Sequence, residues 1–139
     1  MRNSVITATH LVLIRDDREI LLLRRFNTGF QDGNYSLPAG HVEPGELPLA
    51  ASVREAQEEI GLALRPEDLR MSHIVHTPTR AHFFFTVLRW KGEPVNCEPD
   101  KCDHLDWFGL DSLPGNMVPY VRQALACLRK GQAYSERDD

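Results

Sequence analysis

The sequence lacks the cysteine, glycine and proline content of disulfide-rich, collagen-like and low-complexity chains. Its three cysteines, Cys97, Cys102 and Cys127, are an odd number and form no C-x-x-C pair, which argues against a disulfide framework and a cysteine zinc site. Nine glycines and nine prolines are too few for a collagen-like or low-complexity chain. The cysteine pattern is typical of a reducing compartment, so we expect a cytoplasmic protein.

Long apolar runs are also missing. The N-terminal apolar stretch is interrupted by Thr7, Thr9 and His10 and is too short to cross a bilayer, so we expect no membrane partner. The formal net charge is −4 and the pI is about 5.8, which argues against a stable complex with nucleic acid. With 42% hydrophobic residues, the chain has enough apolar surface for one domain over residues 1–139, in which we expect residues 135–139 to be a frayed polar tail.

The hydrophobic pattern predicts an alternation of strands and helices. We expect a turn at residues 16–17, helices at 48–60 and 118–130, and strands at 4–14, 19–25, 71–75, 82–90 and 105–108. In the first helix, the stripe of Leu49, Val53, Ala56 and Ile60 is expected to face the core, and Gly61 to end the helix. This order predicts an α+β fold, an α/β/α sandwich with a mixed β-sheet between helices.

The whole net charge of the chain lies in one segment. Residues 40–62 contain five glutamates and one arginine, whereas acidic and basic residues balance in the rest of the chain. Glu55, Glu58 and Glu59 stand at positions i, i+3 and i+4 of the predicted helix, which places three carboxylates on one face. Such a face is often only a solvated surface, but repulsion between like charges is also relieved by a divalent cation with oxygen ligands.

The turn before this helix favours the metal site. Gly40, Pro44 and Gly45 bend the backbone ahead of the helix, where a carbonyl oxygen is able to face a cation. Arg54 precedes Glu55 and can orient the carboxylates. Oxygen ligands next to a guanidinium suit the hydrolysis of a polyphosphate, in which a cation neutralises phosphate charge and activates water.

These residues follow a known signature. The segment resembles the box of the Nudix hydrolases, G-x5-E-x7-R-E-U-x-E-E-x-G-U with U an aliphatic residue. Every fixed position is present, and only the first aliphatic position holds a small residue; the matching residues are Gly40, Glu46, Arg54, Glu55, Ala56, Glu58, Glu59, Gly61 and Leu62. The predicted element order is similar to the Nudix fold over nearly the whole chain.

The resemblance implies a metal site and a reaction. It implies that Glu55, Glu58, Glu59 and the carbonyl of Ala39 bind Mg²⁺ or Mn²⁺. Arg54 is then expected to hold the carboxylates, and Glu46 to support the loop or bind a further cation. The implied reaction is attack of water on a diphosphate linkage in a nucleoside diphosphate derivative.

The general base is open within the family. Some members use a glutamate of the box, here Glu58 or Glu59, and others use one from a distant loop, for which Glu98 is the candidate. The segment from Asn96 to Cys102 also resembles an N-x-E-P-x-K-C pattern in a branch that includes nucleotide-pool sanitising enzymes and plant terpene-diphosphate hydrolases.

Substrate contacts are predicted from residue type alone. Arg24 or Arg25, at the end of a strand, is a candidate for a phosphate, and Tyr35 and Phe30 are candidates for stacking on a base. We expect Trp107 to pack in the core, and His73, His76 and His82 to serve as polar packing or substrate-edge contacts.

Three further functions stay open beside the nucleotide hydrolase. They are an enzyme for a non-nucleotide organic diphosphate such as an isoprenoid diphosphate, a nucleotide-sensing Nudix module without catalysis, and an enzyme that removes a 5′ diphosphate from RNA. The intact box favours hydrolysis, and the absence of a basic excess counts against RNA. We expect a small phosphorylated molecule as partner, and the sequence leaves both a monomer and a homodimer open.

Overall fold

The first predicted strand divides between two sheets. The computed structural model describes residues 1–139, and in it β1 (Ile6–Val12) belongs to one sheet, whereas β2 (Ile14–Arg15) belongs to another. The chain changes sheets at Leu13. Asp16 and Asp17 then take left-handed φ values of 54° and 53°, which confirms the predicted turn and gives the twist that a tight hairpin needs.

The larger sheet is mixed, as predicted. Its order is β5-β1-β7-β6-β9, in which β1 pairs in parallel with β7 and β6 in parallel with β9, while the other two pairs are antiparallel. The new strands are β5 (Ala39–His41), β6 (Leu69–His76), β7 (Arg80–Val87) and β9 (Tyr134–Glu136). A short 3₁₀ turn at Pro66–Asp68 leads into β6.

The second sheet is built around β3 (Glu19–Arg25). Its partner β8 (Cys102–Gly109) runs antiparallel along the whole of β3, and β2 and β4 (Tyr35–Ser36) pair with the two ends of β3 on the other edge. The sequence predicted β3 with these bounds, and β8 as a shorter strand.

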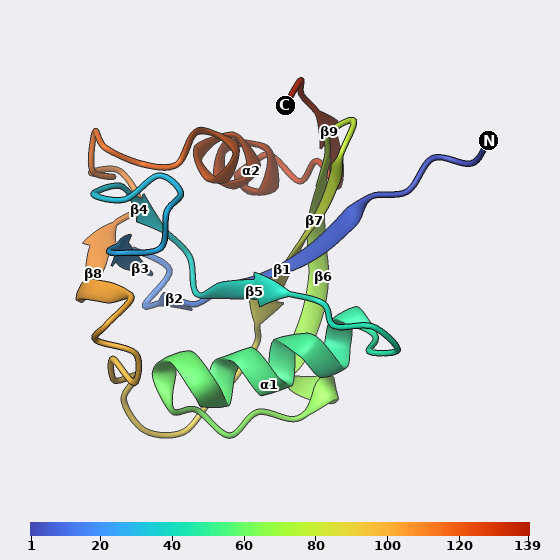
Figure 1. Cartoon of the computed structure of the whole chain (residues 1–139). Coiled ribbons are helices and arrows are strands. Elements are labelled where there is room, and N and C mark those ends of the chain that lie inside the picture. Colours follow the sequence, from blue (N-terminus) through green and yellow to red (C-terminus); the bar gives the residue numbers. More distant parts are fainter.

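Two helices cover opposite faces of β1 (Figure 1). The Thr9 hydroxyl is hydrogen-bonded to Ser52 in α1 (Pro48–Ile60), whereas the next residue, His10, stacks edge-on against Tyr120 in α2 (Pro119–Arg129). Because successive side chains of a strand point to opposite faces, these contacts place the sheet between the helices and confirm the sandwich. Neither helix is long and apolar enough to cross a membrane.

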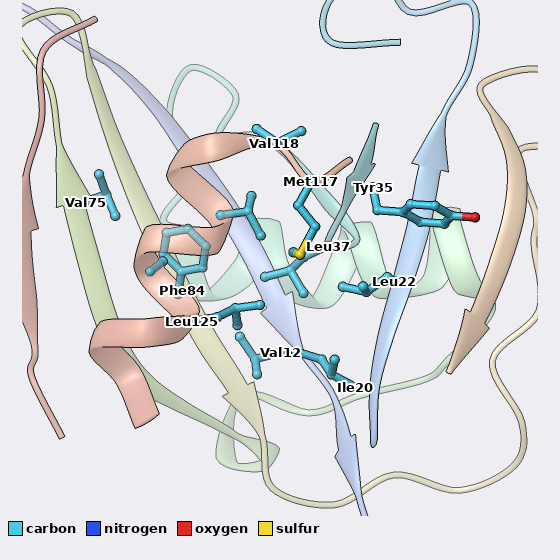
Figure 2. Close-up of a cluster of buried hydrophobic side chains, with 12 residues drawn as sticks. Val12, Ile20, Leu22, Tyr35, Leu37, Val75, Phe84, Met117, Val118 and Leu125 are labelled. Carbon is cyan, nitrogen blue, oxygen red and sulfur yellow. The ribbon is translucent and has the colours of Figure 1, made fainter. Parts of the chain in front are cut away.

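The two faces carry separate apolar clusters. Figure 2 shows the cluster on the α2 side, where Val12 and Phe84 of the sheet pack with Leu125 of the helix. The cluster on the α1 side contains Leu11, Phe85 and the other buried residues that pack with Ala56 and Ile60. The central strand β7 is therefore buried on both faces, as its continuous apolar run predicts.

Two expectations about these elements are wrong. Leu49 is 40% exposed, because α1 packs against β1 and β5 through a face of small residues that includes Ala51 and Ser52. The predicted frayed tail at residues 135–139 is wrong in its first two residues, because Tyr134–Glu136 forms β9 on the edge of β6. The fully buried His73 holds this segment through the backbone carbonyl of Gln132 and the hydroxyl of Ser135, each at 2.8 Å.

Candidate active site

The predicted site opens into a cavity of about 530 Å³. One wall carries Glu59 from α1 and Glu98 from the loop before β8, with Ala39 and Gly40 of β5 beside them. Other parts of the wall come from β1, β7 and the N-terminal turn of α2. The cavity therefore joins the box to residues that are far from it in the sequence.

Gly40 is the point where β5 and α1 approach most closely. A Cβ atom on Gly40 would lie 2.1 Å from Oε1 of Glu55, a distance that no real contact allows. The missing side chain thus leaves the space that the Glu55 carboxylate fills. Glu55 is only 9% exposed, and burial raises the pKa of its carboxyl group.

Ala39 presents its backbone to the helix and not to the sheet. Pro38 and Val42 form the hydrogen bonds to β1, so the residue between Pro38 and Gly40 turns its polar groups away from β1. The Ala39 N–H accordingly donates to Oε2 of Glu59 at 2.8 Å. Because the N–H and C=O of one strand residue share an edge, the Ala39 carbonyl lies on the edge that faces this helix.

Arg54 gathers the other carboxylates of the box. It binds Glu46 with two hydrogen bonds of 2.8 and 2.9 Å and also donates to Glu55 at 2.7 Å and Glu58 at 3.2 Å. These bonds lower the pKa of Glu46 to about 2. Glu46 also accepts the N–H of Glu43 at 3.0 Å, so its carboxylate ties Arg54 to the loop before the helix.

Among the carboxylates of the box, Glu59 is the one without an ion pair to balance its negative charge. Its pKa is raised well above the usual value, first by burial and then by the charge of Glu55, and the nearby Glu98 adds to the rise. Glu55 and Glu59 are more buried than residues on a solvated helix face. Of the three carboxylates on the helix, only Glu58 is half exposed, at 52%. Glu55 and Glu59 each accept an N–H donor, from Arg54 and Ala39, and the three helix carboxylates do not converge into a closed cluster of metal ligands.

A rigid loop brings Glu98 to the box. The N–H groups of Val95 and Cys97 donate to the carbonyls of Ile60 and Glu59 at the end of α1. The Asn96 side chain then accepts the Glu98 N–H at 3.0 Å and donates to the Cys102 carbonyl at 2.7 Å. The asparagine of the N-x-E-P-x-K-C pattern thus sets the direction of the loop that carries the distant glutamate.

The loop also explains the glycine that ends the box. Gly61 has a φ of 70°, and its N–H bonds to the carbonyls of Ala56 and Gln57, which confirms it as the helix terminator. A Cβ on Gly61 would lie 3.2 Å from Sγ of Cys97 and 3.3 Å from Val95. A side chain here would press on the loop that carries Glu98.

Of the two arginines predicted to bind a phosphate and Tyr35, only Arg25 reaches the cavity. Arg25 lines it and is held by the Phe30 carbonyl at 2.6 Å. Arg24 alternates to the other side of β3 and pairs with Asp103 at 2.7 Å. Tyr35 is 7% exposed within the core, and its hydroxyl, which points away from the cluster in Figure 2, is hydrogen-bonded to His104.

The predicted aromatic and histidine residues are also divided between the core and the cavity. Trp107 stacks on Trp90 and packs against the apolar cluster, as expected. His73 is polar packing, and His82 lines the cavity. Residue type did not point to His10 or Arg80, which share the cavity wall with His82. Side chains two residues apart on a strand share a face, so the positions of His10 in β1 and Arg80 in β7 could have been linked to that of His82. This link requires knowing that β1 and β7 are neighbours in the sheet.

Comparison with known proteins agrees with this geometry. The NUDIX domain model matches residues 5–128. An NAD-capped RNA hydrolase of Chromobacterium violaceum is 32% identical over 82% of this chain, and an 8-oxo-dGTP diphosphatase of Escherichia coli is 30% identical over 79%. The aligned region spans 42% of the first protein and 88% of the second.

A solved structure shows the same fold. The MutT NUDIX hydrolase of Burkholderia pseudomallei superposes with a TM-score of 0.79 and 30% identity, over 88% of this chain and 97% of that one. The α+β sandwich with a carboxylate-rich loop and helix is thus the architecture of a known class of hydrolases. This chain belongs to the NUDIX family.

Proposed function

We propose that this protein is a divalent-metal-dependent pyrophosphohydrolase that uses water to cleave a diphosphate linkage in a nucleoside di- or triphosphate derivative. The observation that carries the proposal is that Glu59 and Glu98 both line the cavity, with Glu55 close behind them, so that the charges of Glu55 and Glu98 both raise the pKa of Glu59. Arg54 is committed to Glu46 and Glu55, so it does not neutralise Glu59. A cation bound there would balance this charge.

The residues present fit such a cation. Oxygen ligands are available from Glu55, Glu58, Glu59 and the Ala39 carbonyl, which is the ligand type that Mg²⁺ and Mn²⁺ prefer. The space at Gly40, which a Cβ would close, lets the Glu55 carboxylate lie against the strand that carries this carbonyl. When bound, the cation neutralises phosphate charge and lowers the pKa of the attacking water.

The protein's own groups take the remaining roles. Glu98 is the candidate to accept the proton of the attacking water, because the Asn96 bonds fix its loop and it shares the cavity wall with Glu59. Glu58, the most exposed carboxylate of the box, is the alternative base. Arg25, which lines the cavity, is the candidate to bind a phosphate, and Arg54 is the positioning residue for the box carboxylates.

Three further points belong to the proposal. Relatives named for 8-oxo-dGTP and NAD-capped RNA support a nucleotide-derived substrate. The unpaired state of all three cysteines supports a cytoplasmic location. A single domain over residues 1–139 is supported by β9, which ties the C-terminal segment to the sheet.

A phosphate-release screen with Mg²⁺ and with Mn²⁺ tests the function. The panel contains canonical and oxidised nucleoside triphosphates, ADP-ribose, NAD, NAD-capped RNA and isoprenoid diphosphates, each with and without a coupling pyrophosphatase. We expect turnover of a nucleotide, abolished by EDTA, and the ratio of orthophosphate to pyrophosphate identifies the bond that is cleaved. Turnover confined to isoprenoid diphosphates contradicts the nucleotide assignment, and metal binding without any turnover favours a sensing module.

Replacement of each candidate base separates their roles. Glu98→Gln is expected to lower kcat at pH 7 by about 100-fold or more with metal affinity unchanged, as the loss of a general base does. Glu58→Gln is the matched variant on the box helix. An activity that survives Glu98→Gln and is lost in Glu58→Gln, with unchanged metal affinity, would assign the base to the box.

A further inference from the structure

Two buried side-chain nitrogens have no hydrogen-bond partner in the protein, and both belong to residues that line the cavity. They are Nδ1 of His10 and Nη1 of Arg80. His10 is 1% exposed, and Arg80 forms no ion pair with any carboxylate of the chain. Buried polar atoms in native proteins are nearly always satisfied, so two unsatisfied atoms on residues that line one cavity point to a ligand.

The topology brings these two groups together. β1 and β7 run in parallel, with Ala8 of β1 opposite His82 of β7. Side chains two residues apart share a face, so His10 lies on the same face as Arg80 and His82. His10 Nε2 lies 3.0 Å from His82 Nδ1.

Aromatic contacts fix the two imidazole rings. His10 is stacked on Phe84, with ring centroids 4.4 Å apart, and His82 is stacked on Tyr120 of α2 at 4.0 Å. The rings are therefore held between the sheet and the helix. Each ring keeps one nitrogen outside the bond between them, Nδ1 of His10 and Nε2 of His82.

One hydrogen bond joins the two imidazoles, so one proton lies between the two rings. Burial lowers the pKa of His10 and takes that of His82 to about 4, so both rings are neutral at pH 7. If His10 donates to His82, then His10 Nδ1 is an acceptor; if His82 donates, then His10 Nδ1 carries the hydrogen and is a donor. Arg80 is always a donor.

We propose that His10, His82 and Arg80 form a subsite for the uncharged polar head of the substrate, a nucleobase edge that presents a carbonyl oxygen to Arg80 and a ring nitrogen to His10. This inference rests on the proposed function and names the residues that read the base. The pair has two neutral tautomers, so His10 Nδ1 matches a ring nitrogen of either polarity; in the change from one to the other the shared proton passes from His10 to His82, His10 Nδ1 gains a proton and His82 Nε2 loses one. An isoprenoid tail in the same place would leave both nitrogens buried and unpaired, so the subsite selects against it.

The neutral pair also separates this subsite from the phosphate end. A diphosphate carries several negative charges, and Arg80 is the one charged group among the three residues. The carboxylates Glu59 and Glu98 stand on the wall where a cation would balance phosphate charge. A base at His10 and a diphosphate near Glu59 would thus use two walls of one cavity.

Steady-state kinetics of Arg80→Met and His82→Phe test the subsite. On the best nucleotide of the screen, we expect KM to rise about tenfold or more while kcat stays within about threefold. Arg70→Met and His76→Phe are matched controls on the neighbouring strand β6, outside the cavity, and are expected to keep the wild-type KM. An unchanged KM in both test variants, with nucleotide turnover intact, would overturn the subsite and leave the proposed function standing.

Nitrogen-15 NMR of the wild-type imidazoles tests the subsite without turnover. In protein labelled at histidine, two neutral rings with one N–H between them are expected at pH 7, and the corresponding nucleoside monophosphate is expected to shift the His10 Nδ1 resonance. An imidazolium at either residue, or no shift at saturating monophosphate, contradicts the proposal. Hydrolysis of isoprenoid diphosphates alone in the screen would instead remove the nucleotide function on which the subsite depends.

Discussion

At the scale of single residues, the sequence predicted which side chains matter better than it predicted their surroundings. The box fixes Glu55, Glu58 and Glu59 because one face of a helix requires that spacing. It does not reveal that the loop carrying Val95 and Cys97, 35 or more residues further along the chain, is hydrogen-bonded to the end of α1 beside Glu59. The burial of Glu59 depends on these contacts. For the same reason, residue type could not separate Arg25 from Arg24, whose side chains point to opposite sides of β3.

Gly40→Ala tests the space that Glu55 occupies. The new Cβ would overlap the Glu55 carboxylate, so the Glu55 side chain must move. The backbone of strand β5 is expected to stay as it is. We expect affinity for Mn²⁺ or catalytic rate to fall about 10–100-fold, as for other changes that displace a metal ligand. Gly115→Ala, where a Cβ meets nothing, is the control, and a Gly40→Ala protein with wild-type metal affinity and rate would refute the role of this close approach.

Glu59→Gln has a predicted effect on stability in the absence of metal. Burial and the charge of Glu55 raise the pKa of Glu59 in the folded protein, so ionisation opposes folding at a pH above the folded value. Below the unfolded value of 4.5 both states are protonated and the penalty is absent. In EDTA the variant is therefore expected to melt above the wild type at pH 8 and at the same temperature near pH 4.

Thermal melts at the two pH values provide this measurement. Glu93→Gln, at an exposed loop position, is the control and is expected to show no such pH-dependent difference. A Glu59→Gln protein that melts below the wild type at pH 8 in EDTA would show that the ionised carboxylate does not destabilise the fold.

At the scale of elements, the helices were predictable and some strand pairings were not. The α1 helix has the predicted bounds because Pro48 starts it and Gly61 ends it, both through local backbone chemistry. β9 was missed because its three residues are mostly polar, and they form a strand by pairing with β6 and not through an apolar pattern of their own. β2 was merged with β1 because the change of sheet at Leu13 leaves the hydrophobic run unbroken.

Ser135→Ala tests the attachment of β9. The Ser135 hydroxyl lies 2.8 Å from Nε2 of the fully buried His73 and 2.9 Å from Nε2 of Gln123. Its loss leaves the imidazole nitrogen unpaired and should lower the free energy of unfolding by about 1–2 kcal/mol. Urea denaturation measures this change.

Activity of the same variant gives a second readout. β9 and β5 are the opposite edges of the larger sheet, so kcat/KM of Ser135→Ala is expected to remain that of the wild type. Ser4→Ala, at the exposed N-terminus, is the control for stability. Equal stability of Ser135→Ala and the wild type would mean that β9 is not held by this bond.

At the scale of the whole molecule, function depends on a cavity that no single segment contains. Its walls come from β1, β3, β5, β7, both helices and the loop before β8. The parallel pairing of β1 with β7 joins residues more than 70 positions apart, which places His10 beside His82. The sequence pattern indicated the fold class through element order, but the partners of each strand depend on packing between distant segments.

The central claim is that the box carboxylates make a metal-dependent hydrolase. The most direct test is the initial rate of phosphate release by wild-type protein and Glu59→Gln on the best nucleotide of the screen, at saturating Mg²⁺ and with circular dichroism confirming that both are folded. We predict turnover by the wild type and a loss of about 1,000-fold or more in the variant, because a site with one ligand fewer cannot hold the cation for transition-state stabilisation. A folded Glu59→Gln protein with near-normal turnover would contradict the account.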